Sequence, residues 1–135
     1  MAGYSGTPLW KKLGYAAGIS AYADGAPSGY HSLLALPAGM KVTWLARARP
    51  GVRFVHLFAT GSAALRTKLR SYRRRIDPGG VIWVSWPKRG SGVATDITED
   101  VIRGLALPIG LVDIKVCAVD EVWSGLKLMI RKDQR

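Results

Sequence analysis

Apolar residues along the chain follow two different spacings. Residues 53–59 and 81–86 are nearly continuous apolar runs, which are typical of strands covered on both faces. Between these runs, apolar positions recur at intervals of 4, 3 and 4 residues, the period of an amphipathic helix. These positions are Leu65, Leu69, Tyr72 and Ile76. The pattern predicts strands over 53–59 and 81–86, with a helix over 62–76 that the turn-forming residues 77–80 bring to an end.

Capping and turn residues predict the elements of the amino-terminal part. A short helix is expected at residues 8–13, with Thr7 as its N-cap, Pro8 at its first position and Gly14 beyond its end. The same kinds of signal predict three more elements: strands at 19–23 and 41–45, and one or two helical turns at 30–35.

The carboxyl-terminal part is expected to contain one helix and a hairpin. Glu99 lies three residues after Asp96, which is the spacing of a capping box, so the helix is expected to start at Asp96 or at Thr95. Residues 112–119 and 126–131 alternate or run apolar and are separated by a short turn. These two segments predict an antiparallel hairpin.

The order of these elements predicts the fold class. Strand and helix alternate through the centre and a hairpin closes the end, which indicates a three-layer Rossmann-like α/β fold with a mostly parallel sheet of five or six strands. We expect a single domain over residues 1–135 with a short amino-terminal helix. The seven residues 46–52 are fewer than a parallel crossover usually needs, so the strand at 41–45 is expected to be antiparallel or displaced.

The net positive charge of the chain predicts an anionic partner. The 135 residues include 20 Lys and Arg against 9 Asp and Glu, a net charge of +11. Residues 41–75 hold ten basic residues, and residues 25–76 hold no carboxylate. Part of the charge forms a basic face on the helix at 62–76, consisting of Arg66, Arg70, Arg73 and Arg74. Nucleic-acid binding is one hypothesis and a solvated helix face is the other, since no helix-turn-helix, zinc-finger, RRM or KH signature accompanies the charge.

A second basic segment is the loop after the strand at 81–86. Glycines free its backbone N–H groups, two cations stand beside them, and a helix start follows, which together favour an anion site. The candidate residues are Lys88, Arg89, Gly90, Ser91, Gly92 and Thr95. Asp96, Glu99 and Asp100 oppose this hypothesis because they already bring negative charge to the helix start.

In open α/β sheets, ligands bind beyond the carboxyl ends of the parallel strands. The crevice expected there includes Trp86, Asp120, Trp123 and Ser124. Tryptophans at strand ends stack on planar ligands or anchor packing, and the second role is the commoner one. His56 lies within an apolar strand and is expected to be a hydrogen-bonded core residue. No nucleophile elbow or metal-ligand spacing is present, so we assign no catalytic residue and no metal.

Several protein classes conflict with the sequence. A single cysteine, Cys117, excludes an internal disulfide framework. No apolar stretch reaches the length of a membrane span, and the amino terminus lacks the layout of a signal peptide, so we expect a cytoplasmic protein without a membrane partner.

Five strings, spread over nearly the whole chain, resemble the bacterial family called domain of unknown function 3052. They are GYSGTPL at 3–9, SWPK at 85–88, SGVATD at 91–96, TEDV at 98–101 and VCAVDEVWSGLK at 116–127. The resemblance is weakest from about residue 26 to residue 53. The family implies no established activity.

More distantly, the layout resembles a shortened class I methyltransferase. DPGGVIWV at 77–84 is similar to the turn into the fifth strand of that fold, and the hairpin is similar to its sixth and seventh strands. This resemblance implies a cofactor loop that holds Asp24, Gly25, Gly29 and Tyr30. The loop has only two glycines with a proline between them, and residues 46–49 (ARAR) replace the acidic residue expected to hold the ribose. A third strand and its helix are expected to be missing.

These observations favour a non-catalytic or ligand-binding protein on a degenerate methyltransferase-like scaffold, with no cofactor expected. They do not identify its partner, for which a small anionic ligand is one candidate. Two alternatives stay open. One is a methyltransferase that uses S-adenosylmethionine (SAM) through an atypical loop, and the other is a basic nucleic-acid-binding protein.

Overall fold

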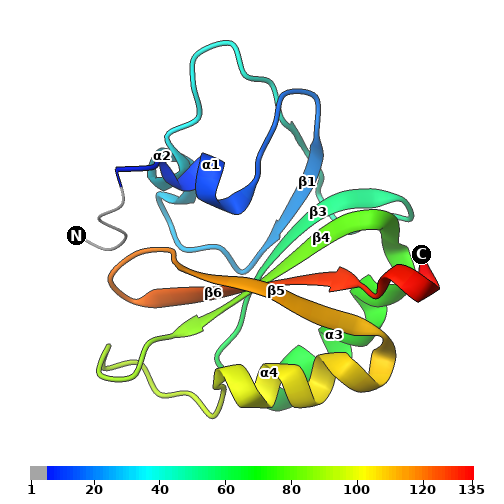
Figure 1. Ribbon diagram of the computed structural model, residues 1–135. Helices are drawn as coiled ribbons and strands as arrows, with labels where there is room; N and C mark the ends of the chain where they lie inside the picture. Colours follow the sequence, from blue (N-terminus) through cyan, green and yellow to red (C-terminus); the bar gives the residue numbers. More distant parts are fainter. Residues whose placement is uncertain (1–5) are drawn as a thin grey trace.

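A computed structural model describes residues 6–135, which form a mixed six-stranded sheet between two layers of helices (Figure 1). The strand order is β2-β1-β3-β4-β6-β5. The strands are β1 (Ser20–Asp24), β2 (Thr43–Trp44), β3 (Val52–Phe58), β4 (Ile76–Pro87), β5 (Leu111–Ala118) and β6 (Trp123–Ile130). The first four strands are parallel, whereas β6 runs antiparallel to both β4 and β5. The Rossmann-like fold with a carboxyl-terminal antiparallel hairpin is confirmed.

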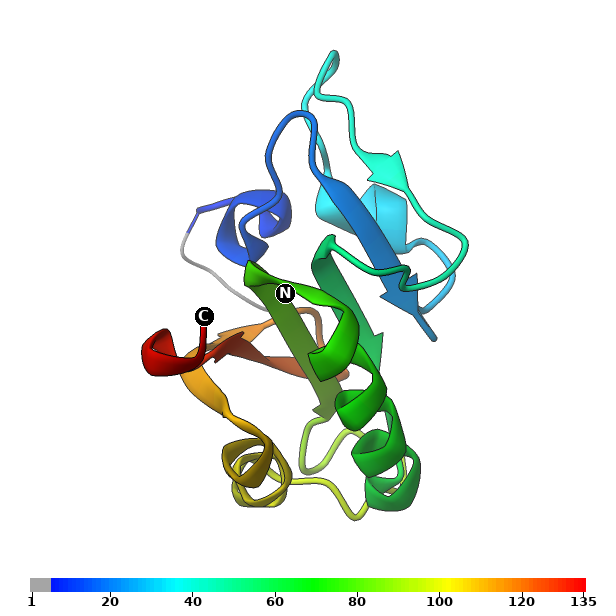
Figure 2. The same ribbon diagram turned by 90° about the vertical axis from the view of Figure 1, so that its right-hand side faces the viewer.

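Helices cover both faces of the sheet (Figures 1 and 2). The helices α1 (Leu9–Leu13) and α2 (Tyr30–Leu34) pack over one core with apolar side chains of β1, β3 and β4. The helices α3 (Ser62–Arg75) and α4 (Glu99–Ala106) cover the other face and bury a second apolar cluster. Two short 3-10 segments, Leu107–Ile109 and Lys132–Gln134, follow α4 and β6.

The short strand β2 decides between the two alternatives predicted for residues 41–45. It is displaced to the edge of the sheet, as one of the two alternatives required, but it runs parallel to β1 rather than antiparallel. The strand is only two residues long, so the chain has to return by only about 7 Å before it enters β3 on the other side of β1. Residues 45–51 can make that return without a helix.

The helix α1 begins one residue later than its capping signals predicted. Pro8 has extended backbone angles and occupies the N-cap position, which the sequence assigned to Thr7. Gly14 ends the helix in the left-handed conformation, as its position predicted. The first strand is likewise shifted by one residue, to Ser20–Asp24.

Strand β4 begins earlier than the sequence predicted. Ile76 already pairs with Val52, and the register shifts before Phe54 pairs with Val81. The residues expected to form a turn at 77–80 are therefore an irregular extension of the strand. Glycine is required at position 80, because a Cβ atom there would lie 2.7 Å from the Ile76 side chain.

The start of α4 is the clearest correction. The helix begins at Glu99, and its N-cap is Thr98, whose hydroxyl accepts a hydrogen bond from the Val101 N–H at 3.2 Å. Asp96 does not cap this helix. Its carboxylate instead accepts hydrogen bonds from the backbone N–H of Ser62 at 2.8 Å and from the Ser62 hydroxyl at 2.6 Å. It thereby caps α3, whose own N-cap residue is Gly61 and has no side chain to do so.

A chain of hydrogen bonds runs through the core beneath α2. His56 is fully buried, and its Nδ1 lies 2.6 Å from the Tyr30 hydroxyl, which in turn lies 2.7 Å from the Tyr15 hydroxyl. Its Nε2 lies 2.7 Å from the Ser85 hydroxyl. Because every polar atom of the imidazole has a partner, the expected role of a hydrogen-bonded core histidine is confirmed.

Candidate functional site

The carboxyl ends of the parallel strands β1, β3 and β4 meet at one edge of the sheet, where Asp24, Phe58 and Pro87 are their last residues. This is the edge at which α/β folds of this kind bind ligands. Two segments lie at this edge, the loop after β1 and the segment after β4. A groove between α3 and the segment after β2 lies beside the sheet and reaches toward its opposite edge, where Pro50 and Arg75 precede β3 and β4.

The carboxylate at the start of the loop after β1 is already bonded to other side chains of the protein. The Asp24 carboxylate is 13% exposed and accepts hydrogen bonds from the Lys68 ammonium at 3.1 Å and from the Tyr72 hydroxyl. Burial first, and then the bond to Asp24, raises the pKa of Tyr72, which keeps the phenol protonated as the donor. The carboxylate at the end of β1 is thus tied to α3.

The two loop glycines and Tyr30 also have structural roles. Gly25 has φ +70°, and a Cβ atom there would approach the carbonyl oxygen of Phe58 to 3.0 Å, so only glycine fits without strain. Gly29 has φ +82° and precedes α2. The Tyr30 ring is buried by the core, with its hydroxyl bonded as described above, so its side chain does not face an open site.

The segment after β4 borders a pocket of about 730 Å³. Its lining includes six residues predicted for the anion loop or the crevice: Trp86, Lys88, Arg89, Gly90, Thr95 and Ser124. Ser91 and Gly92, predicted with them, do not line it. The walls also carry Glu99, Asp100 and Arg103, so their charges are mixed.

Most charged groups of this pocket already have partners. The Lys88 ammonium donates to the backbone oxygen of Asp120 at 2.6 Å, and Arg103 forms ion pairs with Glu99 and Asp100. Arg89 is the one lining cation that has no hydrogen bond or ion pair within residues 6–135. The partner of Lys88 is a neutral oxygen, so two cations of this pocket, Lys88 and Arg89, have no ion pair, and they share the lining with two carboxylates.

The remaining crevice residues hold the hairpin turn together. The Asp120 carboxylate accepts hydrogen bonds from the backbone N–H groups of Val122 and Trp123, both at 2.8 Å. Trp123 packs edge-on against Phe58, with ring centroids 5.1 Å apart. Trp86 is buried in the core on the α3 side. These contacts agree with tryptophans that anchor packing.

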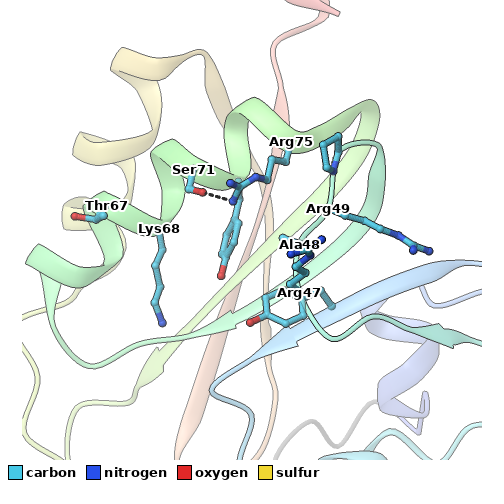
Figure 3. Close-up of a pocket in the computed structure, with 10 residues that line it drawn as sticks. Arg47, Ala48, Arg49, Thr67, Lys68, Ser71 and Arg75 are labelled. Atoms are coloured by element: carbon cyan, nitrogen blue, oxygen red, sulfur yellow. Dashed lines mark hydrogen bonds between the residues drawn. The ribbon is translucent and has the colours of Figure 1, made fainter.

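The groove between α3 and the segment after β2 was not predicted from the sequence (Figure 3). We call this pocket of about 570 Å³ the basic groove. Its lining residues are Tyr22, Arg47, Ala48, Arg49, Pro50, Thr67, Lys68, Ser71, Tyr72 and Arg75. Figure 3 shows residues of α3 along one wall and the 47–49 segment along the other, with the Arg49 side chain extending away from α3.

The basic groove carries four cationic side chains and no lining carboxylate. Lys68 is paired with Asp24, and the Arg75 guanidinium donates to the Ser71 hydroxyl at 2.6 Å. Arg47 and Arg49 are exposed and have no ion pair or hydrogen bond within the described part of the chain. A signal was available in the sequence, since the ARAR segment at 46–49 and the cations of the helix at 62–76 share one carboxylate-free stretch.

The predicted basic face of α3 divides into two parts. Arg73 is half-buried, and its guanidinium donates to the backbone oxygen of Ile109 at 2.9 Å and to the side-chain oxygen of Gln134 at 3.2 Å. It therefore fastens α3 to the carboxyl-terminal segments. The other three, which we call the outer arginines, are exposed and have no partner among residues 6–135: Arg66, Arg70 and Arg74.

The side chains that could ligate a metal ion lie apart from one another in the described residues. Within residues 6–135, no His, Cys, Asp and Glu side chains gather in groups of three or more that could hold a metal ion. Over the same residues, no helix combines the length and the apolar character needed to span a membrane.

Burial raises the pKa of the Cys117 thiol, which keeps it protonated and poorly reactive.

Comparison with known proteins identifies the fold. The structure is similar to a SAM dependent methyltransferase from Aquifex aeolicus, with a TM-score of 0.64, 15% identity, and coverage of 89% of this chain and 86% of that chain. It is also similar to ribosomal protein L11 methylase from Lactobacillus delbrueckii subsp. bulgaricus (TM-score 0.59, 9% identity, 90% and 74% covered). A third similar structure is magnesium protoporphyrin IX methyltransferase from Synechocystis PCC 6803 with bound SAH (TM-score 0.57, 10% identity, 84% and 74% covered). The chain thus has a methyltransferase-like α/β fold, and at these identities the likeness concerns the fold alone.

Sequence comparison gives no family. No family model matches the chain, and no curated protein matches its sequence. Membership in domain of unknown function 3052 therefore stays a prediction, carried by the five strings. The first of these strings, at residues 3–9, lies partly outside the described residues.

The residues at the expected cofactor position differ from those that the methyltransferase resemblance implies. The resemblance implies an acidic residue after the second strand, and the segment in that place contributes Arg47 and Arg49 to the basic groove. The Asp24 carboxylate at the end of β1 is bound to Lys68 and Tyr72.

Proposed function

We propose that this protein binds an anionic ligand in the basic groove and does not transfer methyl groups. The observation that carries this proposal is the charge of the lining, which has four cationic side chains and no carboxylate. The scaffold is that of a methyltransferase, shortened between β2 and β3, and the binding surface lies where that shortening brings residues 46–50 opposite α3.

Size and chemistry support an anion of moderate dimensions. A volume of about 570 Å³ lies within the range of small-molecule sites, which is roughly 300–1,000 Å³. Guanidinium groups bind phosphate and carboxylate oxygens in bidentate fashion, and Arg47 and Arg49 are free to do so. The Thr67 and Ser71 hydroxyls on the opposite wall can add neutral hydrogen bonds.

The test is a calorimetric titration with inorganic pyrophosphate, compared between two single-charge variants. Arg47→Gln removes a groove cation, whereas Arg89→Gln removes an equally unpaired cation from the pocket after β4. We expect Arg47→Gln to weaken binding by about tenfold, since a charged hydrogen bond contributes about 1.4 kcal/mol or more, and Arg89→Gln to leave binding unchanged. Equal binding by the wild type and both variants, or no binding by the wild type, would refute the proposal.

A SAM-dependent methyltransferase is the second candidate, and the solved structures that share the fold favour it. Titration with SAM decides between the two, and we expect no binding at micromolar concentrations. Gly25→Val is unsuitable as a control because its side chain would collide with the Phe58 carbonyl group. Asp24→Asn keeps the size of the side chain. Micromolar SAM binding that Asp24→Asn removes would establish the methyltransferase in place of our proposal.

A further inference from the structure

We propose that the ligand of the basic groove is the phosphate backbone of a single-stranded nucleic acid, which continues from the groove across the outer arginines of α3. This inference rests on the proposed function, because it names the class of anion that the groove takes. It adds that the binding surface is longer than the groove itself.

The periodicity of α3 joins the two cationic surfaces. At about 100° per residue, Arg74 lies between the groove side of the helix, which carries Arg75, and the side that carries Arg66 and Arg70. Residues 66 and 74 are about 12 Å apart along the helix axis. The cations therefore follow a continuous path around the helix rather than forming isolated points. Figure 2 shows α3 at the surface of the molecule, so this path is open to a polymer.

The charges along this path are unpaired, which favours a polyanion over a solvated face. Arg47, Arg49 and the outer arginines have no ion pair within residues 6–135. The carboxylates nearest in sequence are both engaged, Asp24 with Lys68 and Asp77 with Arg53. A small anion would need only the groove. Three further free arginines next to it give additional binding energy only to a ligand that carries further phosphates.

The aromatic rings beside the cations indicate whether the protein contacts the bases or the backbone of a nucleic acid. The two aromatic rings of the groove, Tyr22 and Tyr72, are half-buried or buried and pack edge-to-face with centroids 6.1 Å apart. Because these rings already pack against each other, we infer contact with the backbone and little sequence preference. A pocket of about 570 Å³ has room for one phosphate backbone, so we infer a single strand and test a duplex as the alternative.

Salt dependence gives the size of the expected effect. Six cations line the path: three in the groove, Arg47, Arg49 and Arg75, and the three outer arginines. At about −0.7 per phosphate contact on a single strand, the slope of log K against log salt would be about −4, a loss of about 300-fold between about 50 and 200 mM salt. Replacement of the outer arginines by glutamine should reduce that slope to about −2 and the loss to about 20-fold.

The experiment measures fluorescence anisotropy of a labelled oligothymidine of about a dozen nucleotides at several salt concentrations, with circular dichroism to check the fold of each variant. The matched control carries Lys11→Gln, Lys41→Gln and Lys132→Gln, which remove three exposed cations from other parts of the surface. We expect the outer variant to lose about half of the slope and the control to keep it. Equal losses in both variants, no binding at about 50 mM salt, or equal affinity for a duplex of the same length would overturn the inference.

Pyrophosphate separates this inference from the proposal on which it rests. The outer variant should bind pyrophosphate like the wild type, because its three substitutions lie outside the groove lining. If pyrophosphate binding depends on Arg47 but oligonucleotide binding does not depend on the outer arginines, the groove holds a small anion and the nucleic-acid inference fails alone. If Arg47→Gln leaves pyrophosphate binding unchanged, the proposed function fails as well.

Discussion

The buried imidazole of His56 makes stability depend on pH in a way that can be calculated. Burial lowers the pKa of His56 from 6.5 to about 3, because the imidazolium would have to lose its hydration in the core. The unfolded chain therefore binds the proton more readily than the folded chain. The stability that the protein has with a neutral His56 is fully present above about pH 6.5. The free energy of unfolding then decreases progressively as the pH falls toward about 3.

The magnitude follows from the two pKa values. One pKa unit corresponds to 1.36 kcal/mol, so protonation of His56 in the unfolded chain at about pH 5 lowers the free energy of unfolding by about 2 kcal/mol relative to about pH 7.5. The carboxyl groups of Asp96 and Asp113 have pKa values below their usual 3.8, held there by hydrogen bonds from Ser62 and Arg103. Their stabilisation is lost only below about pH 4, outside this interval.

Urea unfolding at about pH 7.5 and pH 5 tests this reasoning, with His56→Gln as the non-titrating reference. The wild type should lose about 2 kcal/mol more than the variant over this interval, whatever the stability of the variant at pH 7.5. NMR titration of the wild type provides a second measurement, in which the imidazole should stay neutral down to about pH 4. Equal losses in both proteins, together with an imidazole that titrates near pH 6.5 in the folded state, would refute the argument.

Three further substitutions test features of the fold. Gly25→Ala should cost about 1–2 kcal/mol more than Gly18→Ala in urea unfolding, because both glycines have positive φ but only the first Cβ would meet a carbonyl oxygen, that of the last residue of β3, at 3.0 Å. Trp83→Phe should cost about 2–3 kcal/mol, since it leaves a cavity and removes the hydrogen bond from the indole N–H to the Leu13 oxygen. Asp96→Ala should lower the melting temperature more than Asp96→Asn, because the amide retains an acceptor for the first turn of α3.

Local patterns were sufficient to predict most elements of this fold. Both β3 and α3 lie within one residue of their predicted bounds, because a continuous apolar run and a 4-3-4 spacing each report directly on burial. The hairpin of β5 and β6 followed from similar signals. Where a residue's partner lay far along the chain, the same rules were ambiguous: Asp96 has the spacing of a cap for α4 but caps α3 instead.

The candidate site was harder to predict, since it depends on tertiary placement. Part of the predicted anion loop and the predicted crevice residue Trp86 border one pocket, because neighbouring residues of one segment stay together. The basic groove joins Arg47 to Lys68, which are 21 residues apart, through the short return from β2 to β3. Sequence periodicity shows which side of a helix is polar, but it does not show which loop that side will meet.

The cap that Asp96 provides for α3 also affects the order in which the chain can fold during synthesis. Ser62 leaves the ribosome 34 residues before Asp96, the residue that completes the first turn of its helix. The sheet closes later still, because β6, the last strand to be made, inserts between β4 and β5. A nascent chain that has been extended only as far as α3 would carry a frayed helix and an open sheet edge. We expect its amino-terminal half to become resistant to proteases only after β6 has paired with β4.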